Sequence, residues 1–277
     1  MNLEREYDIR GRVPAHREIM DGWTRQALAF RSGMAACGRG DSDVIYGHHP
    51  RHVYDLFLPE KDAGGPVALF LHGGYWKATE LDKSRFSHLA AGLTGLGVPV
   101  AVASYRLCPE VEICSIIGDV RQMTAHLARR LARPVIAIGH SAGAHLAACL
   151  LATDWKARGF ETDIVPAALG ISGIYDLRPL LDTSHNEALR LDEMSAFAAS
   201  PLMWPAPKGK ALHLAVGARE GDELIRQSCS IAAAWRGCGV KANCEILDRE
   251  DHFTILDGMT KADGPLTRAA HALSLGA

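Results

Sequence analysis

Short apolar runs alternate along the chain with longer segments in which apolar residues recur every three or four positions. Four of the runs, VALFL, VPVAVAS, VIAIG and ALGIS, are almost wholly apolar. Such runs suit strands that are covered on both faces, as in a mostly parallel sheet. The pattern predicts eight strands in all, at Asp43–Gly47, His52–Leu58, Pro66–His72, Val98–Tyr105, Pro134–Gly139, Ala167–Ser172, Ala211–Gly217 and Ala242–Leu247.

The segments between these runs have the periodicity of amphipathic helices. In SIIGDVRQMTAHLARRLA, the residues Ile116, Val120 and Met123 fall on one face of a helix. DELIRQSCSIAAAWRG repeats the pattern less regularly, and residues 14–37 predict an N-terminal helix packed on the outside. Alternating strands and helices predict an α/β fold with a doubly wound, mostly parallel sheet. The first two strands are more mixed in polarity, which is compatible with an edge hairpin.

Composition and charge narrow the class of protein. The 277 residues are 48% hydrophobic, and we expect one domain over residues 1–277. A formal net charge of −2 gives no signature of nucleic-acid or anionic-membrane binding. The N-terminus lacks the apolar region of a signal peptide, and no apolar run is long enough to span a membrane. The seven cysteines show no C-x-x-C spacing. We therefore expect reduced thiols and a cytoplasmic protein.

One segment breaks the alternation of strands and helices. Residues 174–210 are rich in Asp, Leu, Pro, Ser and Met, and the segment is too long for a simple connection. It follows the carboxyl end of a predicted strand, which is where α/β folds bind their ligands. We interpret it as a small cap-like insertion over the site.

The sequence GHSAG at residues 139–143 matches the G-x-S-x-G nucleophile elbow. Such a turn lifts the Ser141 oxygen off the sheet and places it at a helix N-terminus, which favours developing negative charge. The flanking glycines let neighbouring backbone approach without a Cβ clash. A glycine-rich turn with a helix-capping serine would look the same locally. The position between a predicted strand and a predicted helix favours a nucleophile.

The sequence HGGYW directly follows the strand VALFL. Acyl transfer needs fixed backbone N–H groups around a developing oxyanion, and α/β-hydrolases expose them in glycine-rich sequence after this strand. We predict an oxyanion hole from the N–H groups of Gly74, Tyr75 and Ala142, with Gly73 shaping the turn. An ordinary Gly-Gly turn is the alternative.

A serine needs a base, and in this fold the chain order is serine, acid, histidine. His252 lies just past the last predicted strand, where a loop can present it, whereas His271 lies in a predicted terminal helix. The acid should follow the strand ALHLAVG. Glu220 is favoured there over Asp222, which could instead cap the next helix, and Asp251 is a weaker candidate.

Two further groups of residues have side chains that could contribute to a site. His48, His49 and His52 could suggest a metal cluster, but Pro50 disrupts a shared helix face and a polar strand connection is favoured, so no metal site is predicted. Several aromatic residues could line a substrate pocket, with core packing as the alternative for about half of them. They are Tyr75, Trp76, Tyr175 and Trp204.

Taken together, HGGYW, GHSAGAHLA, ISGIYDLRPL, SPLMW and ELIRQS resemble the serine-type kynurenine formamidases (arylformamidases) and their bacterial esterase relatives. The resemblance covers roughly residues 40–260. It implies an α/β-hydrolase fold with an eight-stranded sheet and a triad of Ser141, an acid and His252. Hydrolysis by such a triad needs no metal or organic cofactor, so we expect none. The family's acid aligns with Glu220, where eukaryotic members carry Asp. Tyr75 replaces the third glycine of the lipase H-G-G-G motif, as in formamidase-like sequences.

Three functions remain open at this point. The first is hydrolysis of an aryl formamide such as N-formylkynurenine, and the second is hydrolysis of short-chain carboxylic esters. The third is a catalytically inactive hydrolase fold that serves as a binding protein, which the intact nucleophile, base and oxyanion hole disfavour. The expected partner is a small acyl substrate, and a homodimer is a further expectation.

Overall fold

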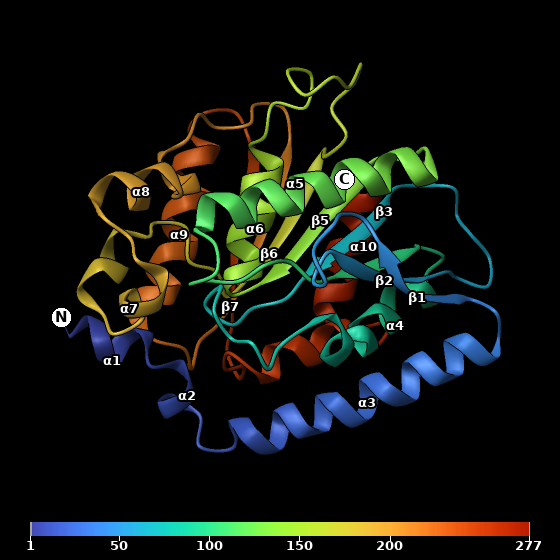
Figure 1. Cartoon of the computed structure of the whole chain (residues 1–277), viewed down its shortest axis with the longest axis horizontal. Helices are drawn as coiled ribbons and strands as arrows, with labels where there is room; N and C mark the ends of the chain where they lie inside the picture. The colour runs from blue at the N-terminus through green and yellow to red at the C-terminus, as the bar shows by residue number, and fades with distance from the viewer. Residues whose placement is uncertain (1, 277) are drawn as a thin grey trace.

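The computed structural model describes residues 2–276 and contains one eight-stranded sheet (Figure 1). The strand order is β1-β2-β4-β3-β5-β6-β7-β8. Strands β1 and β2 form an antiparallel edge hairpin, β2 also pairs antiparallel with β4, and all further pairs are parallel. The predicted α/β class, eight strands and edge hairpin are confirmed. The strands are β1 (Gly40–Ile45), β2 (Val53–Phe57), β3 (Val67–Leu71), β4 (Val100–Ala103), β5 (Val135–His140), β6 (Ala167–Ile171), β7 (Ala211–Gly217) and β8 (Lys241–Leu247).

Helices cover both faces of this sheet (Figure 1). Helices α5 and α6 lie on one face and α4 and α10 on the other, while α9 packs on β7 and β8. The α-helices are α1 (Leu3–Tyr7), α2 (Ile9–Arg12), α3 (His16–Ala36), α4 (Ala91–Gly95), α5 (Ile113–Leu131), α6 (Ala142–Leu151), α7 (Asn186–Leu189), α8 (Glu193–Ala198), α9 (Asp222–Arg236) and α10 (Pro265–Ser274). The 3-10 helices are η1 (Lys83–Arg85), η2 (Ser87–Ala90), η3 (Arg178–Asp182), η4 (Pro201–Met203) and η5 (Thr254–Met259). Among residues 2–276, no helix is long and apolar enough to cross a membrane.

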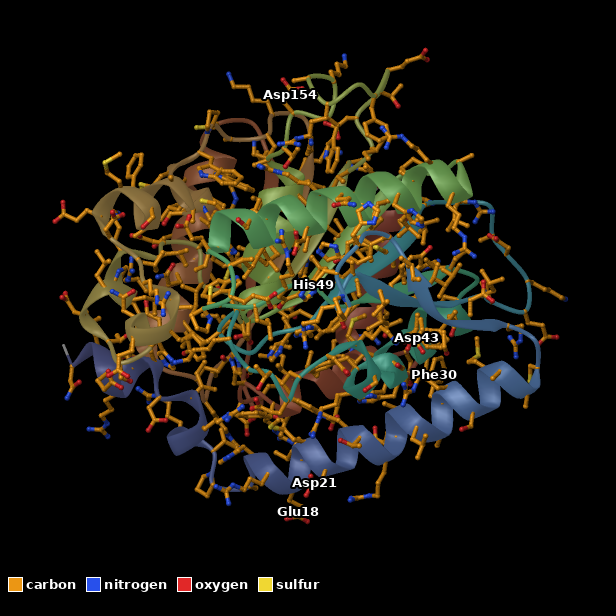
Figure 2. All side chains as sticks on the ribbon, in the orientation of Figure 1. Glu18, Asp21, Phe30, Asp43, His49 and Asp154 are labelled. Carbon is orange, nitrogen blue, oxygen red and sulfur yellow. The ribbon has the colours of Figure 1, made fainter. Side chains whose placement is uncertain are left out.

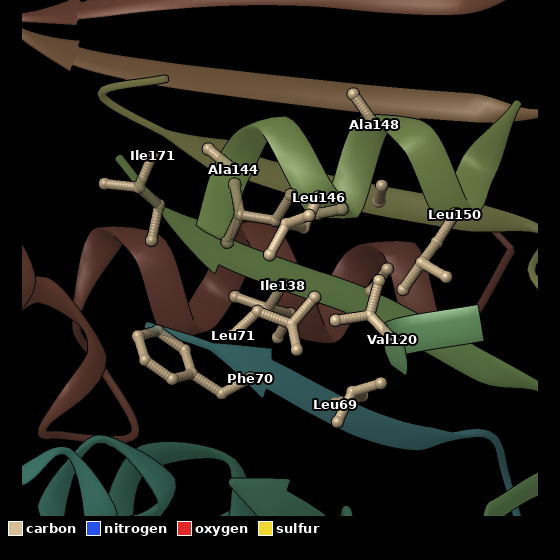
Figure 3. Close-up of a cluster of buried hydrophobic side chains, with 14 of the residues drawn as sticks. Leu69, Phe70, Leu71, Val120, Ile138, Ala144, Leu146, Ala148, Leu150 and Ile171 are labelled. Atoms are coloured by element: carbon tan, nitrogen blue, oxygen red, sulfur yellow. The ribbon is translucent and has the colours of Figure 1, made fainter. Parts of the chain in front are cut away.

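The core lies between the central strands and the helices that cover them. Every residue of β3, β5 and β6 is buried, as their apolar runs predict. Figure 3 shows Leu146 of α6 above Ile138 of β5, within one cluster that also contains Leu71 of β3. Burying a leucine or isoleucine fully contributes roughly 1.5–3 kcal/mol. This packing supports the carboxyl ends of the strands. The candidate site residues lie at these ends.

The N-terminal helix lies outside these layers, close to its predicted bounds of 14–37. Glu18 and Asp21 of α3 are exposed and point away from the molecule (Figure 2). On the inner side, the Trp23 ring packs on Phe86 and Phe253, with centroids 5.6 Å and 5.8 Å away. Helix α3 therefore contacts segments far along the chain.

Candidate active site

The candidate residues gather at the carboxyl edge of the parallel strands. The loop with Gly73 and Gly74 follows β3, and Ser141 follows β5. Glu220 and His252 follow β7 and β8. Because carboxyl ends of parallel strands share one edge of the sheet, residues far apart in sequence meet here.

Ser141 occupies a strained turn between β5 and α6. Its φ of 57° and ψ of −119° lie where L-residues rarely occur, which matches a nucleophile elbow. A Cβ at Gly139 would stand 2.0 Å from the Gly143 carbonyl oxygen, and one at Gly143 would stand 2.0 Å from the Leu71 oxygen. Only glycine fits at either position. The two glycines of the motif are therefore required by backbone contacts that the turn creates.

The loop after β3 lies directly beside this turn. A Cβ at Gly73 would come within 2.9 Å of the Ser141 Cβ. Gly74 has φ of +110° and Tyr75 a φ of +49°, so the backbone turns sharply here. Within the described residues, neither N–H of this pair donates a hydrogen bond. Ala142 begins α6, and a helix leaves its first N–H groups unpaired.

His252 is held by a buried carboxylate. Its Nδ1 lies 2.6 Å from Oε2 of Glu220, and both side chains are buried. Oε1 of the same carboxylate accepts the Ser172 hydroxyl at 2.6 Å and the Gly217 N–H at 2.7 Å. Ser172 follows β6 with a φ of 54°. Three groups thus fix the carboxylate, and Ser172 is a contributor that the sequence did not single out.

The structure brings Glu220, and neither of the two alternative acids, to His252. Asp222 is exposed at the start of α9, where Gly221 rather than Asp222 occupies the N-cap position. Oδ1 of Asp251 accepts the N–H groups of Phe253 and Thr254, which uses that carboxylate to shape its own loop.

His140 supports the same loop from below. Its Nε2 donates to the His252 carbonyl oxygen at 2.9 Å, and the two rings are 4.5 Å apart. Complete burial, together with the nearby His252, keeps the pKa of His140 well below its usual range. A neutral ring with its proton on Nε2 is what this donated bond requires.

The Ser141 hydroxyl and the His252 ring face one cavity of about 430 Å³. Among the described residues, no hydrogen bond joins these two groups, and catalytic hydrogen bonds often shorten only around substrate. Trp23, Phe86 and Phe253 form an aromatic wall of the cavity. The cavity is also lined by charged side chains, namely Asp8, Arg10, Lys77 and Glu80.

The predicted aromatic pocket is wrong in three of its residues, which do not line this cavity. Trp76 is fully buried beneath it, edge-on to His145 at 5.0 Å. Tyr175 is also fully buried. Its hydroxyl occupies the space beside Gly170 of β6 and Gly173, which follows β6. Trp204 donates its indole N–H to the Ala198 oxygen, away from the site. Of the predicted aromatic residues, only Tyr75 lines the cavity.

The N-terminal segment covers the cavity more than the predicted cap does. Of residues 174–210, only His185 lines it, whereas residues 7–10 all do. Tyr75 donates its hydroxyl to the Tyr7 carbonyl oxygen at 2.7 Å, and Tyr7 donates to Glu223 of α9 at 2.9 Å. An ion pair at 2.6 Å joins Arg10 to Glu80. Sequence periodicity gave no signal for this role, since α1 and α2 are only a turn or so long.

The histidine-rich stretch after β1 has ordinary structural partners. Nε2 of His49 lies 2.9 Å from Glu110, and Nε2 of His52 lies 3.1 Å from Asp119. Across residues 2–276, no group of three or more His, Cys, Asp or Glu side chains could hold a metal ion.

The chain is similar in sequence to a known protein family and to several known enzymes. The BD-FAE family matches residues 54–196. Kynurenine formamidase from Danio rerio is 31% identical over 237 residues, covering 82% of this chain and 79% of the relative. The Salmo salar kynurenine formamidase is 32% identical, with 82% and 79% coverage. The isoprenylcysteine alpha-carbonyl methylesterase of Arabidopsis thaliana is 31% identical, but the match covers only 53% of this chain and 37% of the methylesterase.

Solved structures agree with these sequence matches. A Silicibacter protein described as a candidate thioesterase superposes with a TM-score of 0.88 at 31% identity, over 98% of this chain and 99% of the other. An esterase from Pyrobaculum calidifontis gives a TM-score of 0.70 at 18% identity, over 94% and 93% of the two chains, and shows the shared fold alone. The chain is therefore a hydrolase that belongs to the BD-FAE family and to the kynurenine formamidase group of α/β-hydrolases.

Proposed function

We propose that Ser141 is the nucleophile of an acyl-transfer reaction, with His252 as general base and Glu220 as the acid of the triad. The observation that carries this is the 2.6 Å contact between His252 and Glu220 beside the cavity that Ser141 lines. In this arrangement Nδ1 of His252 keeps its proton toward the carboxylate, so Nε2 accepts the Ser141 proton during attack. His252 then protonates the leaving group, and water hydrolyses the acyl-enzyme.

The N–H groups of Gly74, Tyr75 and Ala142 stabilise the oxyanion in this proposal. Support comes from the close approach of the Gly73 loop to Ser141 and from the unused N–H groups of Gly74 and Tyr75. Losing one such donor typically raises the barrier by roughly 3–4 kcal/mol. No metal or organic cofactor is needed for these steps.

The substrate we favour is an aryl formamide of the N-formylkynurenine kind. The aromatic wall of Trp23, Phe86 and Phe253 suits a planar leaving group, because offset or edge-on aromatic contacts add roughly 0.5–1.5 kcal/mol beyond burial. The two kynurenine formamidases among the relatives favour the same class. A short-chain ester is the second candidate, since the family also contains esterases.

A substrate panel on purified protein tests this assignment. We expect N-formylkynurenine to be hydrolysed with a higher kcat/KM than p-nitrophenyl acetate, and Ser141→Ala to abolish both activities without changing the thermal melting temperature. Ester hydrolysis without measurable formamidase activity would reject the aryl formamide. Full activity of Ser141→Ala would reject the nucleophile.

We further propose a homodimer, for which α8 offers an exposed apolar patch at Met194 and Phe197. Light scattering after size exclusion should give twice the chain mass, and the mass of one chain would reject the dimer. A cytoplasmic location is proposed from the seven cysteines, which are all unpaired in the structure. Cell fractionation tests it, and recovery outside the cytoplasm would reject it.

A further inference from the structure

A second groove lies away from the candidate active site, between α5 and the segment that follows α6. Its volume is about 680 Å³, and it shares no lining residue with the active-site cavity. The segment after α6, which carries Asp154, lies near the upper edge of the view in Figure 2. Four arginines line the groove, from two separate parts of the chain. They are Arg121, Arg129 and Arg130 of α5, and Arg158 of the later segment.

The described residues balance only part of the positive charge of this groove. No Asp or Glu is among its lining residues. Within residues 2–276, Arg130 has an ion-pair partner, Asp41 at 3.0 Å, but Arg121, Arg129 and Arg158 have none. The whole chain carries a formal net charge of −2, so this concentration of unpaired guanidinium groups is local.

Arg121 is the most informative of the four. It is partly buried. Within the described residues, its Nε donates to the Thr153 hydroxyl at 3.0 Å, and its guanidinium lies 5.5 Å from the centroid of the Trp204 ring, with no carboxylate beside it. Burial, followed by the nearby Arg158, lowers the pKa of Arg121 below its usual value. Burying a charge without an opposite charge costs free energy. An anion bound between Arg121 and Arg158 would remove both the burial penalty and the repulsion.

The geometry of α5 presents these charges together. Arg121 and Arg129 are eight positions apart, a little over two helical turns, and both line the groove. The Arg129 guanidinium lies 4.6 Å from the centroid of the Phe160 ring, which holds it in a cation–π contact at the groove. Arg121 and Arg129 of α5 thus line the same groove as Arg158 of the segment after α6.

We propose that this groove binds a small polyanion that carries at least two phosphate groups. Guanidinium forks match phosphate oxygens in bidentate pairs, which makes phosphate the anion class that several convergent arginines favour. The volume lies within the range of small-molecule sites. A nucleic acid would need a longer basic track than one groove on an acidic protein. The site is independent of the triad, so it does not rest on the proposed substrate.

Calorimetric titration with pyrophosphate at fixed ionic strength tests the proposal. We expect saturable binding to the wild-type protein, and a Kd that rises by about tenfold or more in the double variant Arg121→Gln/Arg158→Gln. Arg25→Gln is the matched control for the single variant Arg158→Gln, because both variants remove one charge from an exposed arginine and Arg25 lies on α3, on the other side of the molecule (Figure 1). Its Kd should stay within about twofold of wild type.

The single variant Arg158→Gln guards against loss of folding, since Arg158 is exposed. It should weaken pyrophosphate binding while leaving the thermal melting temperature unchanged. Absence of saturable binding to the wild-type protein would overturn the proposal. So would an equal loss of affinity in Arg25→Gln, or binding of a single-stranded oligonucleotide without binding of pyrophosphate.

Discussion

Replacing Glu220 by glutamine tests the proposed acid of the triad, because the structure dictates how an amide must lie at this position. Oε1 accepts hydrogen bonds from the Ser172 hydroxyl and the Gly217 N–H. The Gly217 N–H can only donate, so the amide that replaces Glu220 must turn its carbonyl oxygen toward it. Its NH₂ group then points at Nδ1 of His252, where the carboxylate had accepted a hydrogen bond.

The consequence is the wrong tautomer of His252. An amide N–H that donates to Nδ1 leaves the ring proton on Nε2, so Nε2 faces Ser141 as a donor and cannot take its proton. The same carboxylate-to-amide change in serine proteases lowers kcat by about 10⁴-fold. This corresponds to about 5.5 kcal/mol of barrier. Since shape and volume hardly change, we expect the melting temperature to stay close to wild type.

Steady-state hydrolysis of an aryl formamide and of p-nitrophenyl acetate measures the effect. Asp222→Asn is the matched control, because it makes the same chemical change at an exposed carboxylate two positions away. It should keep kcat within about twofold of wild type, as expected for an exposed charge. If Glu220→Gln retained kcat within tenfold, or if Asp222→Asn lost more activity, the assignment of the acid would be refuted.

Ser172, Trp23 and two buried histidines each have an effect that can be measured. Ser172→Ala removes a 2.6 Å charge-assisted hydrogen bond to Glu220, so kcat should fall about tenfold while KM stays unchanged. The pH profile of kcat should also be displaced, and an unaltered pH profile would mean that Ser172 does not position the acid. Trp23→Leu should raise KM for an aryl formamide more than for p-nitrophenyl acetate, and equal effects on both would contradict an aromatic wall. Burial lowers the pKa values of His72 and His145 to about 4, below the value in the unfolded chain. Between pH 6.5 and 4 the unfolded state therefore binds more protons than the folded state, so stability decreases as the pH is lowered. From these two histidines, the free energy of unfolding in urea should be about 3 kcal/mol lower at pH 5 than at pH 6.5. His145→Gln should reduce that difference, and unchanged stability would contradict this account.

The sequence predicted the parts of the site that depend on local backbone requirements. Gly139 and Gly143 are needed because the elbow brings their Cα atoms against backbone carbonyl groups. This requirement can be recognised from the five consecutive residues 139–143 alone. Strand periodicity then placed Glu220 and His252 after β7 and β8, because parallel strands deliver such residues to one edge.

The residues that the sequence did not predict depend on contacts between distant segments. Trp23 reaches the cavity only because α3 packs on the segments around Phe86 and Phe253. Trp204 has equal aromatic character, yet its indole N–H is used by the Ala198 oxygen. Ser172 gains its role from a single side-chain bond across two strand ends. No pattern within one segment distinguishes these outcomes.

The proposed nucleophile can be tested directly by labelling with a fluorophosphonate probe, followed by peptide mass spectrometry. We predict a single adduct on the peptide that contains Ser141, absent in Ser141→Ala and formed much more slowly in His252→Ala. An adduct on a different serine, or labelling of Ser141 at the same rate without His252, would contradict a serine activated by that histidine.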